Sequence, residues 1–303
     1  MSTIPSIRQA SRQMVRELDV LKGVFRDSGF TYSQCHLLFE LEQHRLLNLA
    51  ELSQILLLDK SNTSRVVNKL IERDLIKVNK TAADKRQKLY SLTPAGEKAA
   101  ANNNCLANKQ VDQAVHLLSD TEQTIISQGL ALYAKALRQS RLQSEFNIRP
   151  IRPEDNPQVA RIIRDVMTEF QAVGQGYSIN DPEVDQMYEA YQGQNACFYV
   201  LEKNERLLGC GGIAPLKGAE QQICELQKMY FFSETRGLGL GKKLVYLLLE
   251  EARKRNYQQC YLETLERMWQ ANLLYQKVGF QKIDGPLGNT GHCSCDAHYL
   301  LDL

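Results

Sequence analysis

The sequence has no long hydrophobic run. Within its 303 residues, no apolar stretch reaches the ~20 residues that a membrane-spanning helix needs. The first ten residues, MSTIPSIRQA, also lack the apolar core of a secretory signal peptide. We therefore predict a cytoplasmic protein whose eight scattered cysteines are reduced thiols.

A recognisable metal-binding pattern is also missing. Cys293 and Cys295 lie close to His292 and His298, but this spacing matches no common zinc motif, and no second cysteine pair faces it. We expect no metal, and we interpret these cysteines as strand or loop residues.

The chain has little net charge, a formal +2 at pH 7, but the charge is unevenly divided. Residues 1–145 carry 20 Lys and Arg against 15 Asp and Glu, whereas residues 146–303 carry 17 against 20. A basic half joined to an acidic half indicates nucleic acid as a partner of the first and a small molecule as a partner of the second. The length fits two domains of ~150 residues each, which we place at 1–145 and 146–303.

The first half begins with short amphipathic helices. Thr31 or Ser33 can cap the second of them, and Asn48 can cap the third. Apolar residues at helical spacing predict helices over residues 7–25, 34–46 and 49–57.

A fourth helix, over residues 59–74, is polar at its start. Two short helices joined by a turn, the second polar at its start, are typical of a helix-turn-helix that enters the major groove of double-stranded DNA. Short polar side chains and Arg65 can reach base edges or phosphates there, although a solvated helix face is the plainer interpretation. The expected inward face is Val66, Val67, Leu70 and Ile71. The predicted DNA-facing residues are Ser61, Asn62, Thr63, Ser64, Arg65, Asn68 and Lys69.

The next segment favours the DNA-binding interpretation. Short alternating strands at 75–79 and 88–92 flank a basic hairpin tip, which is the pattern of a wing. Asp84 is placed to brace the tip beside Lys85 and Arg86, and Arg86 can insert into a narrow, electronegative minor groove.

Two long helices follow, over residues 95–118 and 120–142, the first of them capped by Thr93 with Pro94 at its first position. Their apolar stripes exceed what a winged helix needs to cover, so with the first helix they can form a dimer interface. Residues 1–142 resemble the MarR family of regulators through DKSNTSRVVNKLIERDLI, the Asp-Lys-Arg of the wing and LTPAGE. That resemblance implies a mainly α winged helix-turn-helix, a homodimer, and a pseudo-palindromic operator with half-sites ~34 Å apart.

The second half alternates strands and helices, and we predict a mixed α/β sheet with helices on both sides. Its central feature is Arg236 to Gly241, which follows a strand and precedes a helix over 242–255. Glycines let a backbone approach a ligand closely, and the helix N-terminus offers free N–H groups, so the loop suits a pyrophosphate.

Three interpretations compete for this loop. A dinucleotide site would place Gly-x-Gly-x-x-Gly near the domain start, and a P-loop would follow its glycines with Lys-Ser or Lys-Thr, which Lys242-Lys243 does not provide. The Arg-x-x-Gly-x-Gly spacing, together with Ala271 to Phe280 after the strand CYLET, instead resembles the GNAT family of N-acetyltransferases over residues 146–303.

The GNAT resemblance implies acetyl-CoA as co-substrate and assigns roles to individual residues. Asn272 would contact the CoA arm. Tyr275 would protonate the leaving thiolate, unless it is a core tyrosine. Glu225 would act as general base, unless it is a structural partner of Lys228 or a substrate-side anchor. The expected backbone contacts to acetyl-CoA are made by Met229, Tyr230, Phe231, Arg236, Gly237, Leu238, Gly239, Leu240, Gly241 and Lys242.

The acceptor is less well indicated. His292 either faces it or is a satisfied loop histidine, and both a small amine and a protein lysine fit. We predict a bifunctional transcriptional regulator and N-acetyltransferase, with an acetyl-CoA-sensing regulator without turnover as the alternative. A third possibility, a vestigial helix-turn-helix used only for dimerisation, fits the basic wing poorly.

Overall fold

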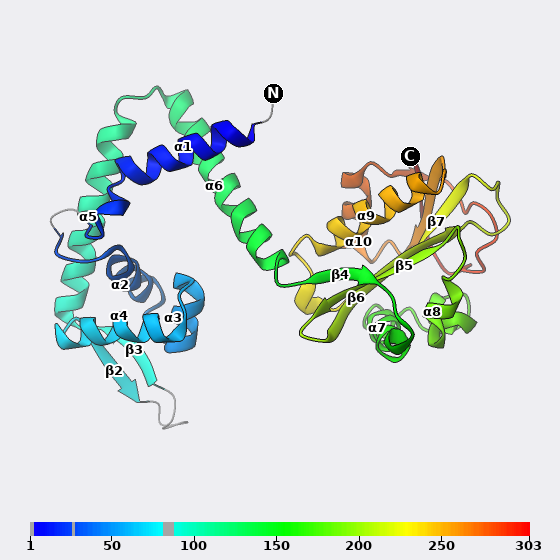
Figure 1. Cartoon of the computed structure of the whole chain (residues 1–303), viewed down its shortest axis with the longest axis horizontal. Helices are drawn as coiled ribbons and strands as arrows, with labels where there is room; N and C mark the ends of the chain where they lie inside the picture. Colours follow the sequence, from blue (N-terminus) through cyan, green and yellow to red (C-terminus); the bar gives the residue numbers. More distant parts are fainter. Residues whose placement is uncertain (1–2, 26–27, 81–87) are drawn as a thin grey trace. The chain divides into compact units, whose positions relative to one another are not determined.

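The computed structural model describes residues 3–25, 28–80 and 88–303. Contacts divide the chain into two compact units, Met1–Ser127 and Gln128–Leu303, each described here by itself (Figure 1). The division falls within a long helix, α6 (Asp120–Gln143), upstream of the predicted limit at residue 145. Within the described residues, no helix combines the length and apolar content that crossing a bilayer requires.

The N-terminal unit is mainly helical and carries one small antiparallel sheet in the order β1-β3-β2. A single apolar core, which includes Leu37, Leu52 and Leu70, joins its helices to this sheet. Its elements are α1 (Ile4–Glu17), α2 (Tyr32–His44), β1 (Leu47–Asn48), α3 (Leu49–Leu56), α4 (Lys60–Glu72), β2 (Ile76–Lys80), β3 (Lys88–Leu92) and α5 (Pro94–Val115), followed by the start of α6.

Side-chain caps explain where these helices begin. Thr31, Asn48, Asp59 and Thr93 each accept a hydrogen bond from the backbone N–H three residues further on, which satisfies one of the unpaired donors of the first turn. The predicted caps Thr31, Asn48 and Thr93 are confirmed.

The first helix is shorter than predicted. It ends at Glu17 instead of Phe25 because the backbone turns into the left-handed region at Asp19 (φ 60°) and again at Gly23 (φ 75°). A short 3₁₀ turn, Val20–Lys22, lies between these residues. The apolar spacing of residues 18–25 therefore does not belong to a continuous helix.

The C-terminal unit is a seven-stranded sheet in the order β4-β5-β6-β7-β8-β10-β9. Only β7 and β8 are parallel neighbours, and all other pairs are antiparallel. The elements after α6 are β4 (Asn147–Pro150), α7 (Asn156–Glu169), α8 (Met187–Ala190), β5 (Cys197–Lys203), β6 (Arg206–Pro215), β7 (Ile223–Phe231), α9 (Leu240–Lys254), β8 (Gln259–Thr264), α10 (Trp269–Val278), β9 (Gln281–Ile283) and β10 (Ala297–Asp302).

Helices cover both faces of this sheet, as predicted. α7 and α8 lie on one face and α9 and α10 on the other (Figure 1). Leu240, Leu244, Val245, Leu248 and Leu249 are buried at helical spacing along α9, which is why this segment docks as a helix. The helix α8 is short, Met187–Ala190, and the strand β9 was not predicted.

Candidate active site and nucleic-acid interface

The strands β7 and β8 separate in the middle of the sheet. They pair only from Ile223 to Glu225 on β7, so the rest of β7 has no partner on its β8 side. A bulge at Lys228, whose φ of 55° is left-handed, bends β7 at this point. The backbone groups of Met229, Tyr230 and Phe231, predicted to hold acetyl-CoA, lie in this unpaired segment, where an extended ligand can hydrogen-bond to them.

Glycines in β6 make room for the bent strand. A Cβ atom at Gly211 would lie 2.2 Å from Sδ of Met229, and one at Gly209 would lie 2.4 Å from the Phe231 ring. The side chains of β7 therefore lie directly over the β6 backbone. These two glycines therefore determine how closely β7 packs on β6.

The glycine loop ends in the N-terminus of α9. Gly237 and Gly239 both have left-handed φ angles, 76° and 77°, and Gly239 is the N-cap of α9 without any side-chain cap. The first N–H groups of a helix have no partner within the helix, so those of α9 are available to an anion. This is the geometry expected for a pyrophosphate.

Two sets of hydrogen bonds and ion pairs hold the glycine loop in place. Arg236 donates to the Phe231 carbonyl at 2.8 and 3.0 Å and forms a two-pronged ion pair with Glu169 of α7. From the last turns of α6, the side-chain amides of Gln139 and Gln143 donate to the Leu238 carbonyl at 3.2 and 2.8 Å. The side chain of Arg236 is therefore committed to protein contacts.

A cavity of about 70 Å³ lies where β7 and β8 diverge. Tyr275 of α10 lines it, and its ring contacts Phe280 and Tyr299. Burial raises the pKa of its hydroxyl well above the ordinary value, so the group stays protonated at neutral pH. No hydrogen bond to this hydroxyl occurs within the described ranges, which leaves it free to serve a ligand.

Glu225 lines the same cavity and is 4% exposed. Its Oε2 accepts a hydrogen bond of 2.6 Å from Gln227, which in turn accepts one from the Tyr191 hydroxyl. Burial is the main cause that raises the pKa of the Glu225 carboxyl. The alternative role of Glu225 as the partner of Lys228 is wrong, because Lys228 pairs with other carboxylates.

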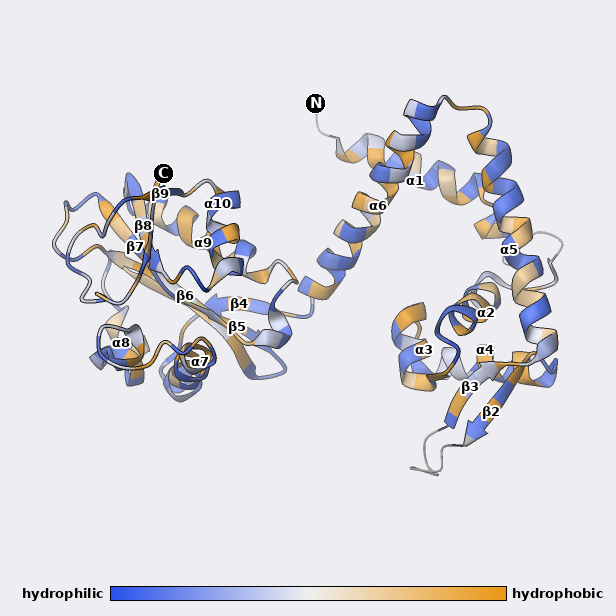
Figure 2. Ribbon diagram, turned by 180° about the vertical axis from the view of Figure 1, so that it is seen from behind, coloured by the Kyte–Doolittle hydropathy of each residue, from blue (hydrophilic) through white to orange (hydrophobic). Residues whose placement is uncertain are grey.

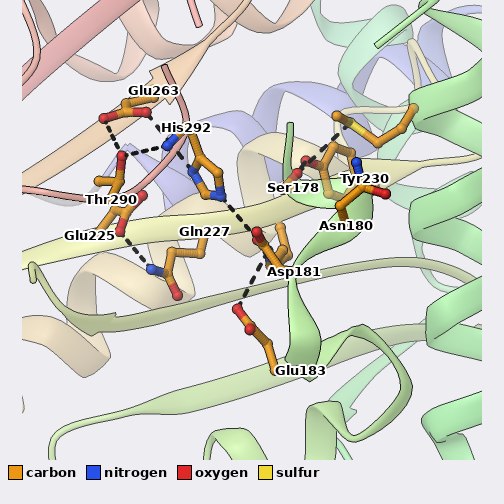
Figure 3. A network of polar contacts seen from close by, with 12 residues as sticks. Ser178, Asn180, Asp181, Glu183, Glu225, Gln227, Tyr230, Glu263, Thr290 and His292 are labelled. Atoms are coloured by element: carbon orange, nitrogen blue, oxygen red, sulfur yellow. Dashed lines mark hydrogen bonds and ion pairs between the residues drawn. The ribbon is translucent and has the colours of Figure 1, made fainter. Parts of the chain in front are cut away.

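Lys228, Asp181 and His292 form a network at the cavity. Figure 3 shows the contact between His292 and Asp181. Lys228 forms an ion pair with Asp181, and Glu183 lies 3.7 Å away. Nε2 of His292 lies 2.9 Å from Asp181. Burial is the largest influence on the pKa of His292 and would lower it, but the hydrogen bond to Asp181 and the charges of Asp181 and Glu225 together outweigh burial, so the pKa is raised. His292 therefore lines the cavity while its ring is satisfied by Asp181, and its contact with an acceptor remains a prediction.

Glu263 completes the lining opposite Glu225. Its side chain is 3% exposed, and Oε1 accepts hydrogen bonds from the hydroxyls of Tyr261 and Thr290 at 2.8 and 2.9 Å. Oε2 has no hydrogen-bond partner in the described part of the chain. The nearest cationic atom is Nδ1 of His292, at 3.9 Å.

Asn272 is occupied within the protein. Its amide donates to the carbonyls of Leu265 and Met268 at 2.8 and 2.9 Å, and its oxygen accepts from the Tyr299 hydroxyl. These contacts hold the start of α10 against β8 and β10. The expected contact between Asn272 and the CoA arm remains a prediction.

Sequence reasoning missed Asp181, Lys228, Glu263 and Thr290 as site residues. Glu263 could have been predicted, because it lies on the same face of β8 as Tyr261, which pairs with Glu225 of β7. Asp181 carried no comparable signal, since a loop brings it to His292 from 111 positions away in the sequence. His, Cys, Asp and Glu side chains of the described residues form no group of three that could hold a metal ion.

The predicted DNA-facing surface of α4 is largely exposed. Ser61, Asn62, Arg65, Asn68 and Lys69 are exposed, and Ser64 is half-buried. Thr63 was predicted on this surface, but it is buried and donates to the Asp59 carbonyl. Its position four and seven residues before Val67 and Leu70 places it on the inward face. The wing residues Asp84, Lys85 and Arg86 lie outside the described residues.

The comparisons with known proteins agree with these features. The family model described as Acetyltransferase (GNAT) family matches residues 160–280, and the model described as MarR family matches residues 28–87. The uncharacterized N-acetyltransferase YjgM of Escherichia coli (strain K12) is 44% identical over 151 residues, which cover 50% of this chain and 90% of YjgM. The chain therefore belongs to the GNAT acetyltransferase family, and its N-terminal unit carries a MarR family domain.

More distant similarities cover one half of the chain at a time. Human N-acetyltransferase 8 is 34% identical over 91 residues, 29% of this chain and 40% of its own length. A Staphylococcus aureus Mu50 acetyltransferase of the GNAT family is 19% identical, with a TM-score of 0.47 over 52% of this chain and 98% of that chain. BpsR of Bordetella bronchiseptica is 21% identical, with a TM-score of 0.37 over 44% of this chain and 99% of that chain.

Proposed function

We propose that the chain is a transcriptional regulator that also transfers acetyl from acetyl-CoA to an amine by direct attack in a ternary complex. The observation that carries the enzymatic part is the cavity between β7 and β8. It is lined by Tyr275 and Glu225, and β7, which also lines it, leads into the glycine loop and the uncapped N-terminus of α9. The phosphates would bind at the helix end and the acetyl group at the cavity.

The chemistry follows from the two residues. The acceptor ammonium loses a proton to Glu225, directly or through water, and the neutral nitrogen attacks the thioester carbonyl. A C–N bond forms and the C–S bond breaks. Tyr275 donates its proton to the departing thiolate, and the nitrogen gives up its second proton, through solvent, to the Tyr275 phenolate as the amide forms. The reaction needs no resident cofactor.

A second candidate function is an acetyl-CoA sensor without turnover. The observation in its favour is the contact of α6 with the glycine loop through Gln139 and Gln143, since α6 is one of the helices expected to form the dimer. Binding of acetyl-CoA to the loop would then change the position of α6 and the affinity for DNA.

Turnover separates the two functions. We would incubate the purified chain with acetyl-CoA and a panel of small amines and lysine peptides, and measure the release of CoA. Release above background with at least one acceptor supports the enzyme. Acetyl-CoA binding without release from any acceptor supports the sensor, and no binding at all contradicts both.

The regulatory part rests on the exposed polar surface of α4. Arg65 and Lys69 can neutralise phosphates, and Ser61 and Asn68 can reach base edges. The dimer that the operator geometry requires is supported by apolar residues that lie along α6 (Figure 2), several of which have exposed side chains. Ile125, Leu132 and Leu137 are 62%, 70% and 53% exposed.

We expect the combined substitution Arg65→Ala and Arg86→Ala to abolish salt-sensitive binding to the DNA upstream of the protein's own gene. Each lost phosphate contact would reduce the slope of log K against log salt by about 0.9. Arg253→Ala, an exposed arginine on α9, is the matched control and should bind as the native chain does. If the native chain does not bind this DNA at low salt, the regulatory proposal is wrong.

A further inference from the structure

Four charged side chains line the cavity, and the two basic ones already have carboxylate partners. This inference rests on the proposed acetyltransferase function and concerns the class of acceptor. The charged residues that line the cavity are Glu225, Lys228, Glu263 and His292. Two of them are acids and two are bases, so the balance depends on which of the bases is already paired.

Both bases are paired by carboxylates that do not line the cavity. The side chain of Lys228 is 3% exposed and forms ion pairs with Asp181 and Glu183. His292 shares Asp181 with Lys228. Neither base is therefore free to bind a carboxylate of a ligand. An anion in the cavity would also meet the field of Glu225 and Glu263.

The two acids, by contrast, have no cationic atom within hydrogen-bond distance among the described residues; Nδ1 of His292 lies 3.9 Å from Oε2 of Glu263. Glu225 is hydrogen-bonded only to the neutral amide of Gln227. Glu263 has one oxygen, Oε2, without any hydrogen bond in the described structure, although its side chain is 97% buried. A buried carboxylate oxygen without a donor is costly, and a donor supplied by a ligand would remove that cost.

We propose that the acceptor is a dication, a diamine or polyamine type of molecule. One of its amino groups reacts beside Glu225, and a second ammonium group binds Oε2 of Glu263. An α-amino acid fits poorly, because its carboxylate would lie next to the reacting nitrogen where no cation is free. Arg267 has no acidic partner among the described residues, but it is exposed, contacts the Tyr177 hydroxyl at 3.4 Å and does not line the cavity.

Three acceptors of equal length test the proposal, since they differ only in the charge of the far end. They are 1,4-diaminobutane, 1-aminopentane and 4-aminobutanoate, whose longest chains all contain six non-hydrogen atoms. We expect kcat/KM to fall in that order, with the diamine ahead of the monoamine by roughly tenfold to a hundredfold, the range for a hydrogen bond to a charged group. A monoamine equal to the diamine, or a preference for 4-aminobutanoate, would overturn the proposal.

Glu263→Gln identifies the group responsible. The glutamine keeps the size of the side chain but removes its charge, so the ratio of diamine to monoamine should fall towards one. Glu250→Gln makes the same change at an exposed position of α9 and should keep the native ratio. Urea denaturation checks that Glu263→Gln is folded. If the folded variant keeps the native ratio of diamine to monoamine activity, another group causes the selectivity and the role of Glu263 is overturned.

Calorimetry separates failure of this inference from failure of the proposed function. The same three ligands are titrated into the native chain and into Glu263→Gln in the presence of desulfo-CoA, which holds the donor site without reacting. Preference for the diamine in binding, without CoA release, supports the subsite and rejects the enzyme. Equal binding of all three, with CoA release, rejects the subsite and leaves the enzyme.

Discussion

Tyr275→Phe should greatly reduce the rate of acetyl transfer and leave the fold intact. A general acid contributes 10²–10⁴-fold to the rate, so kcat should fall by about that factor, equivalent to roughly 2.7–5.5 kcal/mol of transition-state stabilisation. The ring of residue 275 keeps its contacts with Phe280 and Tyr299. Since its hydroxyl has no hydrogen bond in the described structure, the free energy of unfolding should change little.

Tyr257→Phe is the matched control, with the opposite pattern. The Tyr257 hydroxyl donates to the Asn195 carbonyl at 2.8 Å and does not line the cavity. Its loss should lower the free energy of unfolding by about 1 kcal/mol, while kcat stays near the native value. The two tyrosines are both nearly buried, so burial alone cannot produce this difference.

The assays are CoA release at saturating acetyl-CoA and urea denaturation of the same preparations. Because burial raises the pKa of Tyr275 well above its ordinary value, the hydroxyl is protonated across the working range, and the defect should be equal from pH 6 to pH 9. A kcat within threefold of the native value in Tyr275→Phe would refute the acid role. So would an equal loss in Tyr257→Phe.

Two further predictions concern Glu225 and Gly239. Burial raises the pKa of Glu225, so the ionised carboxylate destabilises the folded state once the pH rises through that pKa. Glu225→Gln should therefore lose activity, yet at pH 8 it should unfold at a higher urea concentration than the native chain. Equal urea midpoints for the two proteins would contradict this. Gly239→Ala places a Cβ atom 1.8 Å from Nε2 of Gln139 in a left-handed conformation, which should weaken acetyl-CoA binding measured by calorimetry. Adding Gln139→Ala should restore part of the affinity, and native affinity in Gly239→Ala alone would contradict the loop geometry.

Helix starts were predictable because their causes are local. Thr31, Asn48 and Thr93 accept hydrogen bonds from amides three residues away, so the residue type and its position suffice. The apolar spacing of α9 and the glycines ahead of it were local in the same sense. These signals placed the helix starts within a few residues.

Errors arose where side-chain direction or a backbone turn decided the outcome. Thr63 was assigned to the DNA-facing surface by its polarity, but the helical period places it in the core with Val67 and Leu70. α1 was extended to Phe25 because the apolar spacing continues, whereas the left-handed residue Asp19 ends the helix. A polar residue type or an apolar spacing alone was insufficient in both places.

By itself, the sequence determined that a MarR-like half precedes a GNAT half, and that a glycine loop opens a helix at Leu240. Those conclusions depend on residue types at short, regular spacings, which local backbone geometry translates directly. The tertiary structure alone decided the acceptor side of the cavity. Asp181, Lys228, Glu263 and His292 come from four separate segments. Only the divergence of β7 from β8 and the return of two loops bring these charges within a few ångströms of one another.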